Sequence, residues 1–185
     1  MMENDPEAWI PLFLLSTVLF PRARMGLRVF EPRYLDMVSR CLREQRDFGI
    51  CLNAPGGQEG EPETVGTLAH IVDWGSDDGV LLIEVEGRSR FTVLDWRRES
   101  PVSEGRPRYW VEEPKLPLDF EHEWLKPILV EILGEDLAEN LDASTAGMIL
   151  AQALPAPAAE KQRLLVLDDP LVRLRRIAQL LRRDG

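Results

Sequence analysis

Residues 67–94 read TLAHIVDWGSDDGVLLIEVEGRSRFTVL, and this stretch decides the fold of the first part of the chain. Residues 67–74 and 80–86 are rich in β-branched and other apolar residues and lie on either side of residues 75–79, whose Gly, Ser and Asp residues favour a turn. Gly87 predicts a bulge or bend, after which residues 88–94 continue as a strand. The stretch therefore predicts a β-hairpin whose second strand runs on past Gly87.

Further strands and one helix are predicted around this hairpin. The helix follows Pro32, a residue suited to a first helical turn, because Tyr34, Val38 and Leu42 recur at helical spacing. A polar segment rich in glycine and proline, residues 53–63, predicts a loop. The remaining strands are expected at residues 10–15, 25–30, 48–52 and 108–112.

Beyond residues 113–118, a proline-punctuated segment predicted to be a linker, the apolar spacing becomes helical. One apolar stripe runs from Phe120 to Leu133, and Pro127 is expected to kink or restart this helix. Further helices are expected at residues 143–154 with Asp142 as the cap, at 158–167, and from Asp169-Pro170 to Leu181. The order of strands and then helices predicts an α+β fold, with a β domain at residues 1–117 and a helical bundle at residues 118–185.

The composition is that of a folded, acidic protein. Hydrophobic residues make up 44% and charged residues 29%, while the formal net charge of −10 disfavours affinity for phosphate backbones. Residues 160–185 are locally basic, which is typical of a solvated helix face, with an acidic partner as the alternative. Cys41 and Cys51 lie in apolar settings, which indicates buried free thiols in a reducing compartment. With neither a secretory signal at residues 1–9 nor an apolar run of about 20 residues, the sequence predicts a cytoplasmic protein that does not cross a membrane.

The sequence offers little for catalysis. Its two histidines, His70 and His122, lie near no cysteine or second histidine in sequence, so no metal-ligand spacing is present. Acidic pairs at residues 77–78 and 168–169 are better explained as turn and cap residues than as catalytic carboxylates. The 185 residues contain no glycine-rich nucleotide loop followed by Lys and Ser or Thr. We therefore expect no catalytic residues, no cofactor and no metal site, and we expect a protein that is not an enzyme.

Six pieces of sequence, in order, resemble the amino-terminal, substrate-binding domain of Lon-type proteases. Any one of them is weak evidence, but together they cover nearly the whole chain, from about residue 10 to residue 181. The pieces are Ile10–Phe13 with Val18–Pro21, Phe30–Tyr34, Phe48–Ile50, Val65–Ala69, Val85–Phe91, and Lys161–Leu165 with Asp168–Leu174.

This resemblance implies a PUA-like β-pseudobarrel followed by a small helical bundle, in agreement with the strand-then-helix order. It also implies a non-catalytic protein-binding module that engages unfolded or exposed apolar polypeptide segments. The partners it implies are protein or peptide clients and, as a further candidate, a protease or chaperone. Neither a nucleic acid nor a membrane is an expected partner.

Three groups of side chains are candidates for the polypeptide-binding site. Each group also has a structural interpretation: a corner that fixes how the helix packs on the barrel, core aromatic residues, or cross-strand ion pairs with Glu84 and Glu86. The candidates are Phe30, Glu31, Arg33 and Tyr34 at the start of the helix, Trp74 and Trp96 near strand ends, and Arg88 and Arg90 at alternate positions of one strand.

Two other functions stay open at this point. One is an adaptor that docks on a single protease or chaperone, with the amphipathic helix at residues 171–181 as its docking face. The other is a PUA-like RNA-binding protein that uses the basic strand at residues 88–90. The sequence identifies neither the client, the oligomeric state nor the position of the binding groove, which we expect on the β domain or at its junction with the helices.

Overall fold

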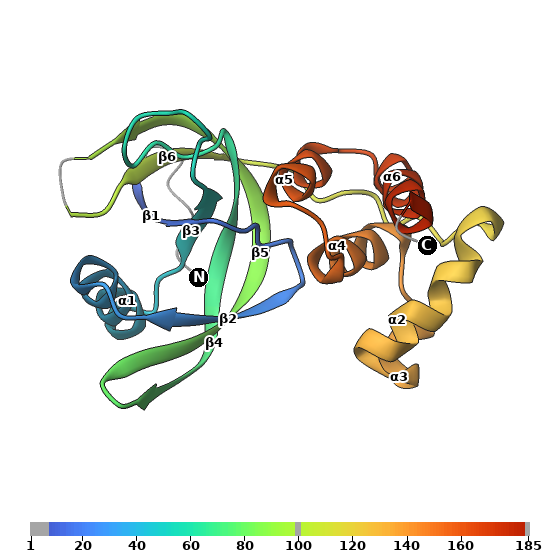
Figure 1. Ribbon diagram of the computed structural model, residues 1–185, viewed down its shortest axis with the longest axis horizontal. Coiled ribbons are helices and arrows are strands. Elements are labelled where there is room, and N and C mark those ends of the chain that lie inside the picture. Colours follow the sequence, from blue (N-terminus) through green and yellow to red (C-terminus); the bar gives the residue numbers. More distant parts are fainter. Residues whose placement is uncertain (1–7, 99–100, 184–185) are drawn as a thin grey trace. The chain divides into compact units, whose positions relative to one another are not determined.

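The computed structural model describes residues 8–98 and 101–183. Their contacts divide the chain into two units, one up to Val111 and one from Glu112 onwards (Figure 1). Strands and a single helix make up the described part of the first unit, and helices make up that of the second. The predicted α+β class, with a β unit followed by a helical one, is confirmed.

The strands of the first unit pair into a sheet that closes on itself. The pairing order is β2-β5-β4-β3-β1-β6, and β6 pairs in addition with β5, so five strands form a ring and β2 lies outside it on β5. β1 and β3 run parallel, whereas the other pairs are antiparallel. The elements are β1 (Ile10–Leu15), β2 (Arg24–Val29), α1 (Pro32–Glu44), β3 (Phe48–Leu52), β4 (Val65–Asp77), β5 (Val80–Arg97) and β6 (Glu104–Tyr109).

The predicted hairpin is confirmed and is the longest pairing of the sheet. β4 and β5 extend as a two-stranded ribbon to a tight turn at Asp78 and Gly79, whose φ angles are 46° and 79° (Figure 1). Positive φ at both central residues is the hairpin geometry that Asp-Gly favours. The register shifts here, because Thr67 pairs with Arg90 and Ala69 pairs with Gly87. The extra residue lies in β5 beside Gly87, so the bulge expected at this glycine is confirmed.

Gly87 is the point at which β5 changes partners. The residues before it pair with β2, and Phe91 and those after it pair with β6. The backbone of the β1–β2 connection presses on this glycine, since an added Cβ would lie 2.1 Å from the carbonyl oxygen of Phe20. Two hydrogen bonds fix the approach, from Arg22 N–H to Gly87 O at 2.8 Å and from Gly87 N–H to Ala23 O at 2.9 Å. Only a residue without a side chain fits here.

β1 is buried on both faces and serves two clusters of core residues. Ile10, Leu12 and Leu14 pack with Phe91 inside the ring. Phe13 points the other way, into a cluster that includes the buried face of α1. Alternate side chains of a strand point to opposite faces, so one strand holds both clusters together.

The helix α1 is fixed at its start by an aromatic pair. The rings of Phe13 and Tyr34 stack with centroids 4.0 Å apart and planes 9° from parallel. Pro32 occupies the first turn, as predicted, and the helix ends at Gln45 in the left-handed conformation with φ 51°. Tyr34 therefore packs the start of α1 against β1.

The second unit is built from short helices whose caps follow the predicted pattern. Asp142 accepts a hydrogen bond from Thr145 N–H at 3.0 Å, and Asp169 accepts from Leu171 N–H at 2.8 Å. The expected restart at Pro127 is confirmed, because a 3-10 helix ends at Leu125 and an α-helix begins at Lys126. The elements are η1 (Phe120–Leu125), α2 (Lys126–Leu133), α3 (Glu135–Ala138), α4 (Ala143–Ala153), α5 (Ala158–Val166) and α6 (Pro170–Arg183).

A buried ion pair ties the start of the second unit to its last helix. Arg173 of α6 is fully buried and donates to both carboxylate oxygens of Glu113, at 2.9 and 2.5 Å. The same guanidinium donates to the carbonyls of Leu164 and Leu167, and Ser144 donates to Glu113 at 2.5 Å. Every charge of the pair is thus met by further hydrogen bonds, as burial requires.

The structure differs from the sequence expectations in the position of one strand and in the exposure of two helical faces. β6 spans Glu104–Tyr109 rather than residues 108–112 and contains Pro107. The predicted docking face on α6 is wrong, because Leu174 and Ile177 are buried within the helical unit. In the stripe from Phe120 to Leu133, Phe120, Trp124 and Ile132 are exposed, whereas Leu125 and Leu129 are buried.

Replacing Gly87 with alanine should destabilise the first unit strongly. The new methyl group would force the Phe20 backbone away, and we expect the free energy of unfolding to fall by about 2–4 kcal/mol. Gly26, within β2, is the matched control because a Cβ there meets no atom within 4 Å. Urea unfolding followed by circular dichroism measures both variants. Equal stability of Gly87→Ala and Gly26→Ala would contradict the close approach described here.

Replacing Arg173 with methionine should destabilise the helical unit. The Glu113 carboxylate would stay buried without its cation, at a cost of about 3–5 kcal/mol. Arg176 pairs with Glu160 at 2.9 Å with its side chain one third exposed, so Arg176→Met should cost about 1 kcal/mol or less. Urea titration of the helical signal at 222 nm compares the two variants, and similar costs for both would argue against the buried pair.

Candidate functional site

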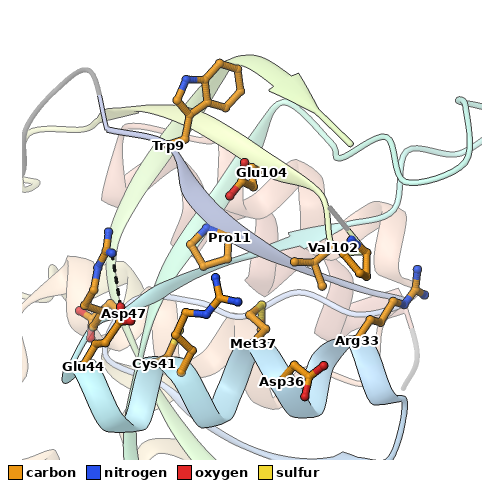
Figure 2. Close-up of a pocket in the computed structure, with 13 residues that line it drawn as sticks. Trp9, Pro11, Arg33, Asp36, Met37, Cys41, Glu44, Asp47, Val102 and Glu104 are labelled. Carbon is orange, nitrogen blue, oxygen red and sulfur yellow. Dashed lines mark ion pairs between the residues drawn. The ribbon is translucent and has the colours of Figure 1, made fainter. Parts of the chain in front are cut away.

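A pocket of about 210 Å³ opens beside α1 in the first unit (Figure 2). Helix α1, the start of β1 and the chain leading into β6 supply its walls. The lining residues are Trp9, Pro11, Arg33, Asp36, Met37, Arg40, Cys41, Glu44, Arg46, Asp47, Pro101, Val102 and Glu104.

The floor of the pocket is apolar. Met37 and Cys41 are both 5% exposed and belong to the α1 face that packs on the core. Figure 2 shows Met37 pointing from α1 towards β1 and Pro11. Val102 closes the floor and packs against the same core cluster. The base of the pocket is therefore continuous with the hydrophobic core.

An indole and an ion pair build the wall opposite α1. The guanidinium of Arg97 lies 4.3 Å from the centre of the Trp9 ring and donates from Nε to Glu104 at 2.9 Å. This cation–π contact and the hydrogen bond place Trp9 as a half-buried aromatic surface at the mouth of the pocket. Such a surface buries much apolar area with few rotatable bonds.

Charges of both signs form the rim. Arg33 donates to Glu31 at 2.9 Å, and Arg46 lies 3.5 Å from Glu44, the ion pair drawn in Figure 2. Four carboxylates and three guanidiniums line the pocket in all, as counted from its lining residues. This balance provides no net positive charge to hold a phosphate group. An apolar floor with a mixed-charge rim fits an apolar side chain of a polypeptide.

The sulfur at the floor is a hydrophobic surface and not a nucleophile at neutral pH. Burial raises the pKa of Cys41 from 9.0 to about 11. Burial also raises the pKa of Cys51, which is 1% exposed within the ring. Both thiols are free, in agreement with the prediction from sequence. A thiol with a raised pKa holds its proton, so it packs as a small apolar group.

Each of the two histidines pairs with one carboxylate. The ring of His70 pairs with Asp47 at 2.8 Å, and that of His122 is buried and pairs with Asp119. Within residues 8–98 and 101–183, no three His, Cys, Asp or Glu side chains are grouped so as to hold a metal ion. Nor is any helix in the described part of the chain long and apolar enough to cross a membrane.

Of the residues that the sequence proposed for the binding site, Arg33 lines the pocket. Glu31 lies beside it as its ion-pair partner. Phe30 is exposed next to this corner, at 68%, whereas Tyr34 is buried with its hydroxyl oxygen near Leu14 N–H at 3.4 Å. The stretch therefore contributes one charge to the rim and a buried ring that holds the helix in place.

The other four proposed residues lie on β4 and β5. Trp74 is 63% exposed near the hairpin turn, and Trp96 is half-buried opposite Gly105 of β6. Arg88 pairs with Glu86 at 3.3 Å. Arg90 is 5% exposed and its guanidinium lies 4.2 Å from the Trp110 ring centre. The basic strand face on which the RNA hypothesis rested therefore presents one paired arginine rather than two free ones.

Sequence reasoning missed most of the pocket. Met37 and Cys41 have the spacing of core residues, and their position at the border of a charged face, beside Asp36, Arg40 and Glu44, was the available signal. Trp9, Val102 and Glu104 carry no local pattern, because only the closing of the ring brings the two ends of this unit together.

Known proteins similar to this chain point to one family. The sequence profile of the substrate-binding domain of ATP-dependent protease La (LON) matches residues 9–146. A Lon N-terminal domain protein from Xanthomonas campestris is 37% identical, with a TM-score of 0.76 over 94% of this chain and 97% of that structure. The N-terminal domain of a Mycobacterium avium complex Lon protease shares the fold, with a TM-score of 0.68 at 17% identity over 94% of this chain and 97% of that one.

A curated relative is a longer protein. It is a LON peptidase N-terminal domain and RING finger protein of Schizosaccharomyces pombe, 24% identical over 217 residues that cover 93% of this chain. The chain spans 44% of the length of that relative.

The thiol at the floor of the pocket should react slowly in the folded protein. With a pKa about two units above the ordinary value of 9.0, the thiolate of Cys41 at pH 8 should be about a hundredfold scarcer than in the unfolded chain. Alkylation by iodoacetamide, followed by mass spectrometry, should speed up about tenfold per pH unit until pH approaches 11. Cys41→Ser identifies the labelled site. Rapid labelling at pH 7 in the native state would contradict the buried position.

Proposed function

The chain belongs to the family of Lon substrate-binding domains, and from this premise we propose that it binds apolar segments of unfolded polypeptides in the pocket beside α1. The role requires no chemistry from the protein. We expect the pocket to hold a leucine- or phenylalanine-like side chain of the client, while the client residues on either side lie along the charged rim.

The observation that carries this proposal is an apolar floor open to solvent. Met37, Pro11 and Val102 offer the occupant hydrophobic contacts, and Trp9 offers a flat aromatic wall. Both arginines and carboxylates line the opening, so the flanking residues of a client can carry either charge. A site of this kind selects hydrophobicity and tolerates sequence, which suits recognition of misfolded chains.

Energetics point to weak, reversible binding by a single pocket. Burial of one leucine or phenylalanine side chain contributes about 1.5–3 kcal/mol. Association costs at least about 4 kcal/mol in lost freedom of motion. Further contacts along the rim must supply the difference, and clients that engage several domains at once gain from high effective concentration.

The chemistry of the described residues supports binding in preference to catalysis. The one thiol in the pocket has a raised pKa, and the side chain of His70 reaches the rim only through Asp47. No pairing of a nucleophile with a base lines the pocket, among the residues that the structure describes there.

Two pocket variants test the proposal against an unfolded client. We expect Trp9→Ala and Val102→Asp to weaken binding of a labelled, reduced and alkylated globular protein by about fivefold to tenfold, because each removes apolar contact at the site. Fluorescence anisotropy of the label measures the affinity. Short neutral peptides with a central Phe or Ser serve as matched ligands, and the Phe peptide should bind more tightly.

Trp74→Ala is the control, since this residue is an exposed tryptophan on the hairpin, away from the pocket lining. It should change the affinity by less than about twofold. If Trp74→Ala weakens binding and Trp9→Ala does not, the site is the hairpin and the pocket proposal is wrong. Absence of saturable binding to any unfolded client would remove the proposed function itself.

A further inference from the structure

The second unit exposes an apolar helical surface that the proposed function does not use. We define the helical arm as residues 120–138, which comprise η1, α2 and α3 (Figure 1). Phe120 is 91% exposed, Leu137 is 66% exposed, and Trp124 and Ile132 are each about two fifths exposed, at 40% and 41%. Apolar side chains exposed in one continuous segment mark an interaction surface.

Other side chains of the arm are buried in the helical unit, so its exposed residues belong to a folded segment. Leu125 and Leu129 are fully buried, and His122 and Ala138 are buried as well. The Arg182 guanidinium of α6 lies 5.6 Å from the centre of the Trp124 ring. One face of α2 is thus fixed in the helical unit, and the exposed Ile132 lies at the edge of that face, one turn after Ile128.

Trp124 of η1 and Ile128 and Ile132 of α2 recur every four residues beside the buried face, with Trp124 and Ile132 exposed and Ile128 half-buried. Residues at this spacing form a ridge along a helix, and a ridge packs into the groove of another helix. An extended peptide would need a row of unpaired backbone groups to bind, and an α-helix does not offer one. The geometry therefore suits an amphipathic helix with its own apolar ridge.

The charges around the ridge favour a basic partner. Within residues 119–142 Lys126 is the one Lys or Arg, and it pairs with Glu123 at 3.1 Å. A second cation, Arg182 of α6, lies against the Trp124 ring at one end of the ridge. The exposed anions on the arm and its end are Glu121, Glu123, Glu131, Glu135, Asp136 and Glu139. A partner with lysine or arginine beside its apolar residues gains attraction, whereas an acidic partner is repelled.

From the exposed ridge and its acidic border, we infer that the helical arm docks a basic amphipathic helix of a partner polypeptide. This site is separate from the pocket beside α1 and takes a different ligand. The partner buries its leucine-like ridge on Trp124, Ile128 and Ile132, and its cations face the carboxylates around them.

The experiment uses the full chain and two designed helical peptides of about 18 residues. Both peptides carry leucine at helical spacing, and one has lysine and the other glutamate on the polar face. The lysine peptide should bind at least about tenfold more tightly, and its affinity should fall as salt rises from about 0.05 to 0.5 M. Fluorescence anisotropy of labelled peptide gives both affinities.

Paired variants locate the site. Ile132→Ser with Leu137→Ser removes exposed apolar contact and should weaken the lysine peptide about tenfold. Glu131→Gln with Glu139→Gln should weaken it about threefold and flatten the salt dependence. Val111→Ser and the pair Asp77→Asn with Asp78→Asn are matched controls on exposed positions elsewhere, and both should bind as the unmodified chain does.

Three outcomes would overturn the inference: equal binding of the two peptides, unchanged binding in the arm variants, or concentration-dependent self-association that Ile132→Ser with Leu137→Ser abolishes. The last would assign the arm to a second copy of the chain, and analytical ultracentrifugation detects it. Trp9→Ala provides the separation from the proposed function, because it should weaken the unfolded client and leave the lysine peptide unaffected.

Discussion

The close approach of the Phe20 carbonyl to Gly87 is the constraint on which the first unit depends. It lets one long strand bend and exchange β2 for β6 as its partner, and this exchange closes the sheet into a ring. Closure brings the beginning of the unit, at Trp9, beside its end, at Glu104, with Arg97 between them. Because Gly87 has no side chain, the ring can close, and parts of the chain that are distant in sequence come together to form the pocket.

The two faces of the pocket have different physical origins. Its floor is the outer limit of the core, because the stacked rings of Phe13 and Tyr34 set α1 against β1 and leave Met37 and Cys41 just beneath the surface. Its rim is made of long charged side chains that cost little to keep in water. An apolar side chain placed there would extend the core by one residue.

Local sequence patterns predicted the elements more completely than the site. The hairpin turn at Asp78-Gly79, the helix after Pro32 and the cap at Asp142 follow from short-range chemistry, and all are present. The predicted position of β6 was wrong because the middle of this strand contains glycine and proline. Both residues argue against a strand when its pairing partners are unknown.

The remaining differences arise from burial, which depends on tertiary structure. Arg90 has the sequence signature of a surface cation and yet lies under Trp110. Glu113 stands in a proline-punctuated segment and yet meets Arg173, 60 residues away in sequence. In the helical arm, one stripe of apolar residues splits into buried Leu125 and Leu129 and exposed Trp124 and Ile132, a division that periodicity alone does not reveal.

The position of β2 outside the ring leaves an open strand edge. The outer side of β2 has no strand partner in the described part of the chain, and the arginines at positions 24 and 28 protect this edge from pairing with other strands. An uncharged open edge would be a template for cross-β growth, and charged side chains on a short edge strand hinder that polymerisation.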